Sequence, residues 1–202
     1  MPDLPPIRRE SSDERKHAIA MAARAIIFEK GLEGLRTRDI AQRVGINIAT
    51  LHYHVPSKDA LIALVAASIR NEFRDQAIAR PREGKNGLEL LRMEFEDFRE
   101  TVVHSPERFI VMTELIERAR RDSAVDAIMR PMTGFWRNQM RDILAAGIAD
   151  GSFRPNIDPV AGSTILVGAL SAWRFSAEVS AAIDAVFAEL ERAFVRTHNP
   201  ED

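Results

Sequence analysis

Apolar residues recur at helical spacing along almost the whole chain. In the segment that begins near residue 12, apolar positions lie three, four and seven residues apart, and the last segment, about 180–197, repeats this pattern. No segment alternates apolar and polar residues persuasively, as a half-buried strand would. We therefore expect an all-α protein with about nine helices, three of which form a small N-terminal unit.

Capping and helix-breaking residues divide the pattern into separate helices. Gly31 is a C-cap candidate, and residues 81–87 (PREGKNG) form the clearest linker. A short helix from Ser123 is expected to be interrupted by Pro131, with a further helix from about 131 to 149, because proline lacks the N–H that continues a helix. Other helices are expected over about residues 12–31, 57–80, 88–104, 106–121, 158–176 and 180–197.

Residues 37–55 contain two short helices joined by a tight turn. Thr37 is a good N-cap for the first helix, Gly45 breaks the chain, and Asn47 is an N-cap for a second helix over about 48–55. Two short helices joined by a turn with glycine form a helix-turn-helix. The second helix of such a unit can lie in the major groove of DNA.

Charge is unevenly distributed along the chain, although the net charge is only −2. Residues 8–58 hold ten Lys/Arg and six Asp/Glu, a net of +4, whereas residues 59–202 hold eighteen and twenty-three, a net of −5. The basic part coincides with the helix-turn-helix, as contact with DNA phosphates requires.

Several classes of function are not supported by the sequence. Cysteine is absent, which excludes disulfides and thiolate chemistry, and no glycine-rich phosphate loop, G-x-S-x-G or H-E-x-x-H motif occurs. His52 and His54 diverge by about 200° on a helix, so they cannot chelate a metal together. With no signal peptide and no apolar run of about 18 residues, we expect a cytoplasmic protein, not an enzyme, with no metal, cofactor or membrane partner.

Short motifs recur through about residues 12–65: Ala22-Ala23, Phe28-Glu29-Lys30-Gly31, Arg38-Asp39-Ile40-Ala41, Gly45-Ile46, Thr50-Leu51, Tyr53-His54, Ser57-Lys58 and Leu61. This N-terminal pattern resembles the tetracycline-repressor (TetR) family of bacterial transcription regulators. The family fold is nine or ten helices in a symmetric dimer, and its larger domain usually binds a small molecule that releases DNA. The resemblance therefore implies a homodimer, a palindromic double-stranded operator and a small-molecule effector.

The chain departs from the common family pattern at several positions. Asn47 stands where Ser is frequent, Ala49 replaces a frequent Gly, and His52 replaces a frequent Tyr, which changes the usual contact at that position. Val55 replaces a frequent Phe and is a smaller core residue. Arg36 stands where Thr is common, so it is expected to add a phosphate contact.

A helical wheel separates the inner and outer faces of the second helix. Ile48, Leu51 and Val55 fall on the side expected to pack inward, while Thr50 and Tyr53 point the opposite way. This outward face offers hydroxyl and imidazole groups to base edges or phosphates; the alternative is a merely solvated surface. The residues expected to contact DNA are Arg36, Thr37, Arg38, Asn47, Ala49, Thr50, His52, Tyr53, His54 and Lys58.

Helix N-termini provide the expected phosphate contacts. Arg38 and Lys58 each stand at the start of a helix, where free backbone N–H groups favour a phosphate. The alternative for Arg38 is an ion pair with Asp39 or Glu33, which DNA could displace because exposed pairs contribute only about 0–1 kcal/mol.

Bulky apolar residues are concentrated in the middle helices of the second half. Methionine and aromatic side chains can line an adaptable apolar cavity, although such residues are more often plain core. Nearby polar groups would orient a ligand there. The candidate pocket residues are His104, Arg108, Met112, Phe135, Trp136 and Trp173.

The last two helices are the expected dimer interface. Small residues there would allow close helix approach, and an apolar stripe runs along the last helix, although part of that stripe must face the protein's own core. The interface residues expected from this pattern are Ala169, Ala172, Ile183, Phe187, Leu190 and Phe194.

Residues 1–11 are expected to be a disordered arm, residues 12–60 a DNA-binding domain and residues 61–202 an effector-binding and dimerisation domain. The function expected is a transcriptional regulator, most simply a repressor released by its effector. Two alternatives stay open: an architectural DNA-binding protein without an effector, and a helical carrier or enzyme with an incidental helix-turn-helix.

Overall fold

The computed structural model describes residues 11–175 and 179–196 and is built of helices in those ranges, which confirms the all-α class. The nine α-helices of the described residues are α1 (Ser12–Lys30), α2 (Thr37–Val44), α3 (Ile48–His54), α4 (Lys58–Ala79), α5 (Gly87–Arg99), α6 (Pro106–Ala119), α7 (Ser123–Asp150), α8 (Pro159–Ser171) and α9 (Val179–Phe194). Short 3-10 turns cover Leu32–Gly34 and Ala172–Phe175, and a π-helical turn covers Glu100–His104.

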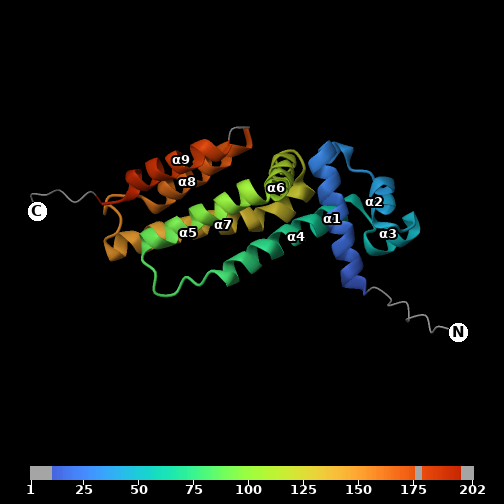
Figure 1. Ribbon diagram of the computed structural model, residues 1–202, viewed down its shortest axis with the longest axis horizontal. Coiled ribbons are helices and arrows are strands. Elements are labelled where there is room, and N and C mark those ends of the chain that lie inside the picture. The colour runs from blue at the N-terminus through green and yellow to red at the C-terminus, as the bar shows by residue number, and fades with distance from the viewer. Residues whose placement is uncertain (1–10, 176–178, 197–202) are drawn as a thin grey trace, which may run out of the picture.

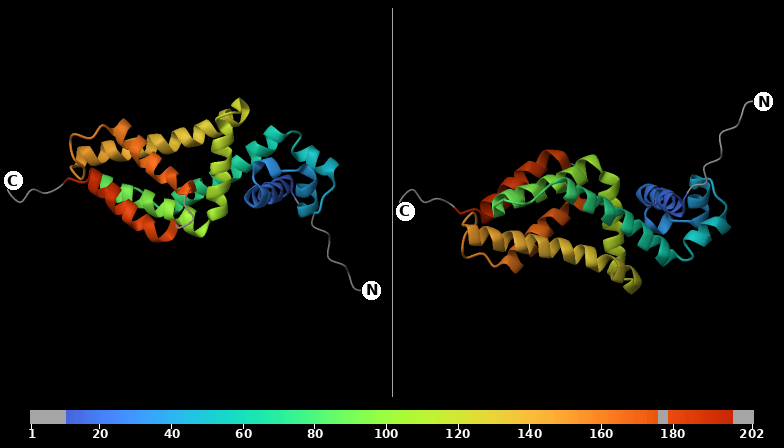
Figure 2. Two further views of the ribbon diagram at one scale, coloured as in Figure 1. Left: turned by 90° about the horizontal axis from the view of Figure 1, so that it is seen from above. Right: turned by 90° about the horizontal axis from the view of Figure 1, so that it is seen from below.

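The molecule is elongated, with α2 and α3 at one end beyond α1 (Figure 1). Helices α5, α7, α8 and α9 run along the other part, and α6 stands across them, between them and α1 (Figure 2). No helix in the described part of the chain is both long and apolar enough to span a membrane.

One apolar core joins the N-terminal helices to α6 and α7. Ile26 of α1, Ile40 of α2 and Leu51 of α3 are almost fully buried in this core. Leu115 of α6 and Met129 of α7 complete it from the second half of the chain. A change in the position of α6 therefore acts directly on α1, which carries α2 and α3.

A second core fills the space among α5, α7, α8 and α9. Leu91, Met140 and Leu166 have no exposed surface there, and the ring of Phe95 stacks on that of Phe187 with centroids 4.5 Å apart. Met112 on α6 packs against both cores. The two cores are thus continuous through α6.

Capping groups set most helix starts where the sequence predicted them. Asn47 Oδ1 accepts from the N–H of Thr50 at 2.7 Å, and Ser57 Oγ accepts from the N–H of Ala60 at 3.1 Å. Ser11, which we expected in the disordered arm, instead caps α1 in a capping box; residues 1–10 of that arm lie outside the described residues, as do the ends of the last two expected helices at 176 and 197.

Two local predictions were wrong. Thr37 is the first residue of α2, and Arg36 is its N-cap without a side-chain hydrogen bond, because the chain is still extended at Arg36. Helix α7 also continues through Pro131 without the expected break. Met129 before it and Met140 after it are both buried, and such burial, about 1.5–3 kcal/mol each, offsets the cost of about 3 kcal/mol for an internal proline.

Helices α5 and α7 approach each other very closely at Gly87 and Gly147. A Cβ atom on Gly87 would lie 2.2 Å from the Cα of Gly147, so no side chain fits between these backbones. Gly87→Ala is therefore expected to lower the free energy of unfolding by about 1–3 kcal/mol, as overpacking does. Urea unfolding followed by circular dichroism measures this.

Gly134→Ala is the matched control, because a Cβ at this position on α7 would meet nothing within 4 Å. It should leave stability unchanged or raise it by up to about 1 kcal/mol, since alanine favours helix. Equal stability of the two variants would contradict the close approach of α5 and α7.

Candidate functional site

Helix α3 presents one face to the core and the other to solvent. Leu51 is only 1% exposed and packs in the first core, whereas Tyr53 is 84% exposed. Ala49 and His52 are also exposed, while Thr50 and His54 are half-buried. The outward face predicted from the helical wheel is therefore present at the end of the molecule (Figure 1).

The inner face of α3 differs from the prediction at one position. Val55 is buried as expected, but the side chain of Ile48 is 41% exposed. Ile48 is the first residue of α3, directly after the Asn47 cap, where the helix has not yet reached the core. It adds an apolar group to the exposed surface of this helix.

The two carboxylates that could pair with Arg38, at the start of α2, have other partners. Asp39, a possible partner of Arg38, pairs with Lys30 at 3.1 Å, and Glu33, the other candidate, pairs with Arg118 at 3.0 Å. Both carboxylates considered as partners of Arg38 are thus engaged by other cations, and neither forms an ion pair with Arg38.

Lys58, the first residue of α4, is also exposed. Arg36 donates from Nη1 to the carbonyl oxygens of Glu33, at 2.6 Å, and Leu35, at 3.3 Å, which holds its head against the preceding turn. Contact of these cations with DNA stays a prediction.

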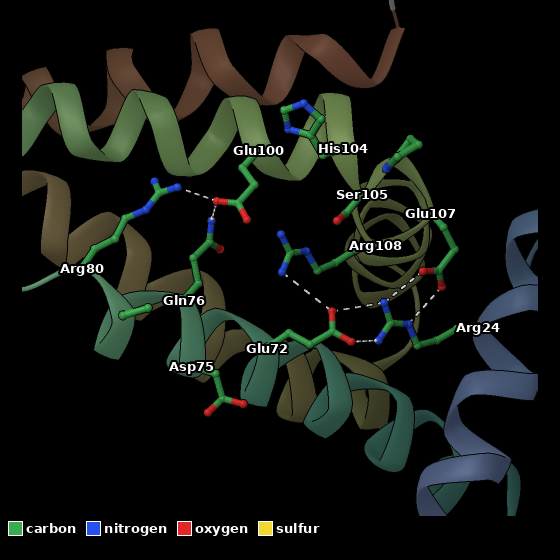
Figure 3. Close-up of a pocket in the computed structure, with 12 residues that line it drawn as sticks. Arg24, Glu72, Asp75, Gln76, Arg80, Glu100, His104, Ser105, Glu107 and Arg108 are labelled. Atoms are coloured by element: carbon green, nitrogen blue, oxygen red, sulfur yellow. Dashed lines mark hydrogen bonds and ion pairs between the residues drawn. The ribbon is translucent and has the colours of Figure 1, made fainter.

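A charged cleft of about 820 Å³ lies between α1, α4, the π-helical turn and α6 (Figure 3). Of the six residues expected to line a ligand pocket, His104 and Arg108 line this cleft. The other lining residues are Arg24, Glu72, Asp75, Gln76, Ala79, Arg80, Glu100, Ser105, Pro106 and Glu107.

The remaining four expected pocket residues do not line the cleft. Met112 is packed between the two cores, and Trp136 and Trp173 pack against the ring of Phe98 with centroids 6.4 and 6.2 Å away. Phe135 is 70% exposed on α7. Aromatic and methionine content predicted an apolar pocket, but these side chains fill core or face solvent instead.

Arg24 of α1 is buried and is the centre of an ion-pair cluster formed with the partly exposed Glu72 of α4 and Glu107 of α6. Its Nε and Nη2 each donate to Glu107 at 2.9 Å, and its Nη1 and Nη2 donate to the two carboxylate oxygens of Glu72. Burial alone would lower the pKa of Arg24, but the hydrogen bonds to Glu72 and Glu107 outweigh it and raise that pKa. This Arg24 cluster ties α1 to α4 and α6.

Sequence reasoning missed the Arg24 cluster. Glu107 is 83 positions from Arg24 and Glu72 is 48 positions away, so no local pattern joins them. The only signal was an arginine directly beside Ala23 on the apolar stripe of the first helix.

The predicted dimer residues are mostly interior. Ile183, Phe187, Leu190 and Phe194 are at most 8% exposed and belong to the second core, so the prediction that this stripe faces a second chain was wrong. The stripe closes the protein's own core, where the ring of Phe187 packs against Phe95 and Phe98 of α5. Ala169 is half-buried and Ala172 exposed.

Unlike the buried stripe of α9, one face of α8 is exposed and consists of small and apolar residues. Ile165 is 58% exposed and Val160 61% exposed. Ala161, Thr164 and Gly168 are exposed on the same helix. Together with Ala172, these residues form a continuous exposed stripe of small and apolar residues.

Comparison with known proteins places the strongest sequence likeness in the N-terminal unit. Residues 19–65 match the family model described as bacterial regulatory proteins, tetR family. The tetracycline repressor protein class D of Escherichia coli is 32% identical over 88 residues, which cover 44% of this chain and 39% of that protein. The chain thus matches well under half the length of that relative.

Other likenesses extend over most of the chain. The HTH-type transcriptional repressor KstR2 of Mycolicibacterium smegmatis is 26% identical over 161 residues, covering 78% of this chain and 74% of that protein. The crystal structure of AibR in complex with isovaleryl coenzyme A and operator DNA has a TM-score of 0.73 at 20% identity, covering 90% of this chain and 98% of that one. The fold beyond the helix-turn-helix is therefore shared as well.

Proposed function

Because this chain belongs to the TetR family of bacterial regulatory proteins, we propose that it is a homodimeric, effector-responsive transcriptional repressor that binds a palindromic DNA operator in the cytoplasm. It acts by binding and not as an enzyme. The observation that carries this proposal is α3, whose Asn47 cap and buried Leu51 hold Tyr53 outward at 84% exposure.

A symmetric dimer would present two copies of α3 to one face of DNA. Recognition helices of such dimers enter major grooves about 34–36 Å apart, one helical turn of the duplex. Two similar proteins support this proposal: KstR2 is a transcriptional repressor, and the crystal structure of AibR is of a complex with isovaleryl coenzyme A and operator DNA.

The exposed stripe of α8 supplies a surface for the dimer. Ala161, Ile165, Gly168 and Ala172 lie four, three and four residues apart, so they share one face of the helix. Small residues on this face let two helices approach closely, and Ile165 adds apolar area. A stable dimer is expected to bury about 2,000 Å² or more in total.

The Tyr53→Ala variant tests the proposed recognition helix. If Tyr53 contacts base edges, its loss should weaken specific DNA binding by about 1–3 kcal/mol without changing stability, because its side chain is largely exposed. Fluorescence anisotropy on DNA selected from a random pool by the wild type measures this.

Phe135→Ala is the matched control, since it removes another exposed aromatic side chain, on α7. It should bind DNA like the wild type. Wild-type affinity in Tyr53→Ala at matched salt would remove the assignment of α3 as recognition helix.

Lys58→Ala should change the salt dependence of binding instead of its sequence preference. Loss of a phosphate contact reduces the slope of log affinity against log salt by about 0.9, and a dimer loses two such contacts. Lys85→Ala, in the exposed linker after α4, is the control and should keep the wild-type slope. An unchanged slope in Lys58→Ala would mean that Lys58 points away from DNA.

A further inference from the structure

Arg108 of α6 is almost completely buried yet poorly partnered. Its side chain is 7% exposed, and a guanidinium carries five N–H donors. Nη2 donates to Thr101 Oγ1 at 3.0 Å, and the cation lies 4.8 Å from the ring centroid of Phe73. Nη1 is 3.7 Å from Glu72, too far for a hydrogen bond, and Nε has no acceptor in the described part of the chain.

The acidic side chains around Arg108 are held by other partners. Glu72 and Glu107 both bond to Arg24, and Glu100 bonds to Arg80 at 2.6 Å. Burial therefore lowers the pKa of Arg108, and the charge of Glu72 only partly offsets this effect. A buried cation in this state favours an additional anion.

The cleft in front of Arg108 has the size and character of a site for a small polar molecule. Its volume of about 820 Å³ falls in the range of about 300–1,000 Å³ that ligand pockets occupy. Gln76 and Ser105 face it with groups that hydrogen-bond hydroxyls (Figure 3), and His104 is also among its lining residues. The wall is completed by a π-helical turn, Glu100–His104, a rare geometry that is frequent at functional sites.

We propose that this cleft binds a small, polar carboxylate, such as a hydroxycarboxylic acid, with the carboxylate on the free donors of Arg108 and its hydroxyls toward Gln76 and Ser105. This inference rests on the proposed function, because it assigns the site and chemical class of the effector.

The position of the site explains how its occupancy reaches DNA. A carboxylate on Arg108 places negative charge beside Glu72, which also holds Arg24 of α1. Bound ligand therefore changes the energy of the contact between the cleft and the helix that carries α2 and α3. A ligand that favours one arrangement of this contact lowers DNA affinity when DNA favours the other.

Thermal unfolding of the full chain without DNA tests the site separately from the proposed function. Malate, tartrate and lactate are compared at matched ionic strength with their neutral counterparts butane-1,2,4-triol, threitol and propane-1,2-diol, and with inorganic phosphate. At least one carboxylate should raise the Tm by about 2 °C or more, and its neutral counterpart and phosphate should not.

Arg108→Gln should weaken binding of that carboxylate by about tenfold or more, since a hydrogen bond to a charged group is lost. Arg108→Lys, which keeps the charge, should bind more weakly than the wild type but more tightly than Arg108→Gln. Arg141→Gln, an exposed arginine of α7, should match the wild type. Unliganded Arg108→Gln should be as stable as the wild type, because it loses a poorly paired buried cation.

Three results would overturn the inference: no carboxylate raises the Tm, phosphate raises it as much, or Arg108→Gln keeps the effect.

Operator DNA is then added to the liganded protein, and release should occur with the wild type but not with Arg108→Gln. If carboxylate binding depends on Arg108 but the protein binds no specific DNA site, the assignment of the cleft stands and the proposed function is rejected.

Discussion

The Ile165→Asp variant is expected to be a monomer that binds operator DNA about 100-fold or more weakly than the wild type. Ile165 lies on the exposed stripe of α8, so the charge does not enter the protein's own core and the monomer should stay folded. In a dimer, however, the carboxylate would be buried against the partner, at a cost of several kcal/mol. Sedimentation at micromolar concentration measures the loss of association.

Phe135→Asp is the control for Ile165→Asp, because it introduces the same charge at an apolar residue of similar exposure on α7. It should remain a dimer with wild-type affinity for DNA. A dimeric Ile165→Asp protein with full operator binding would place the dimer interface on another face.

Arg24→Met is expected to lower the free energy of unfolding by about 3 kcal/mol. Methionine keeps the volume of the side chain but leaves Glu72 and Glu107 without their shared cation. Removing one partner of a buried pair costs about 3–5 kcal/mol, and we expect the lower end because the two carboxylates are 37% and 30% exposed. Urea unfolding at neutral pH measures the loss.

Arg43→Met provides the comparison, because Arg43 makes the same two-bond contact with Glu29, at 2.8 and 2.9 Å, on the surface. Its side chain is 39% exposed, so its loss should cost no more than about 1 kcal/mol. Equal destabilisation by the two substitutions would contradict a special role of the Arg24 cluster in joining α1 to α6.

Features that depend on neighbouring residues could be predicted from the sequence. Asn47 and Ser57 cap helices through hydrogen bonds to residues three positions away, and Gly45 adopts the left-handed conformation with a φ of 75° at the end of α2. These contacts are local and independent of the rest of the fold, so the helix-turn-helix was found with nearly correct bounds.

The spacing of apolar residues could not show whether an apolar stripe packs against the protein's own core or against a second chain. The spacing of Ile183, Phe187 and Leu190 shows that one face of α9 is buried, but the same spacing serves a dimer interface or a monomer core. The structure places these residues in the second core, where the ring of Phe187 packs against Phe95 and Phe98 of α5. The predicted helix break at Pro131 was wrong for a related reason. Burial of side chains before and after the proline outweighs its local preference to end a helix.

The charged cleft depends on contacts between residues far apart in the chain. His104 and Arg108 were selected as polar groups near bulky apolar residues, and both line the cleft. Arg24 and Glu72, which also line that cleft, were not selected from the sequence. Composition predicted an apolar pocket, whereas long-range ion pairs produce a polar one.

Selection of DNA from a random pool, followed by footprinting, tests most directly whether a homodimer reads DNA through two copies of α3. We predict an enriched palindrome with two protected half-sites centred about 10–10.5 base pairs, or a multiple of that, apart on the duplex, and loss of both in Tyr53→Ala. Absence of any enriched sequence, or an asymmetric site that Tyr53→Ala binds as well as the wild type, would contradict it.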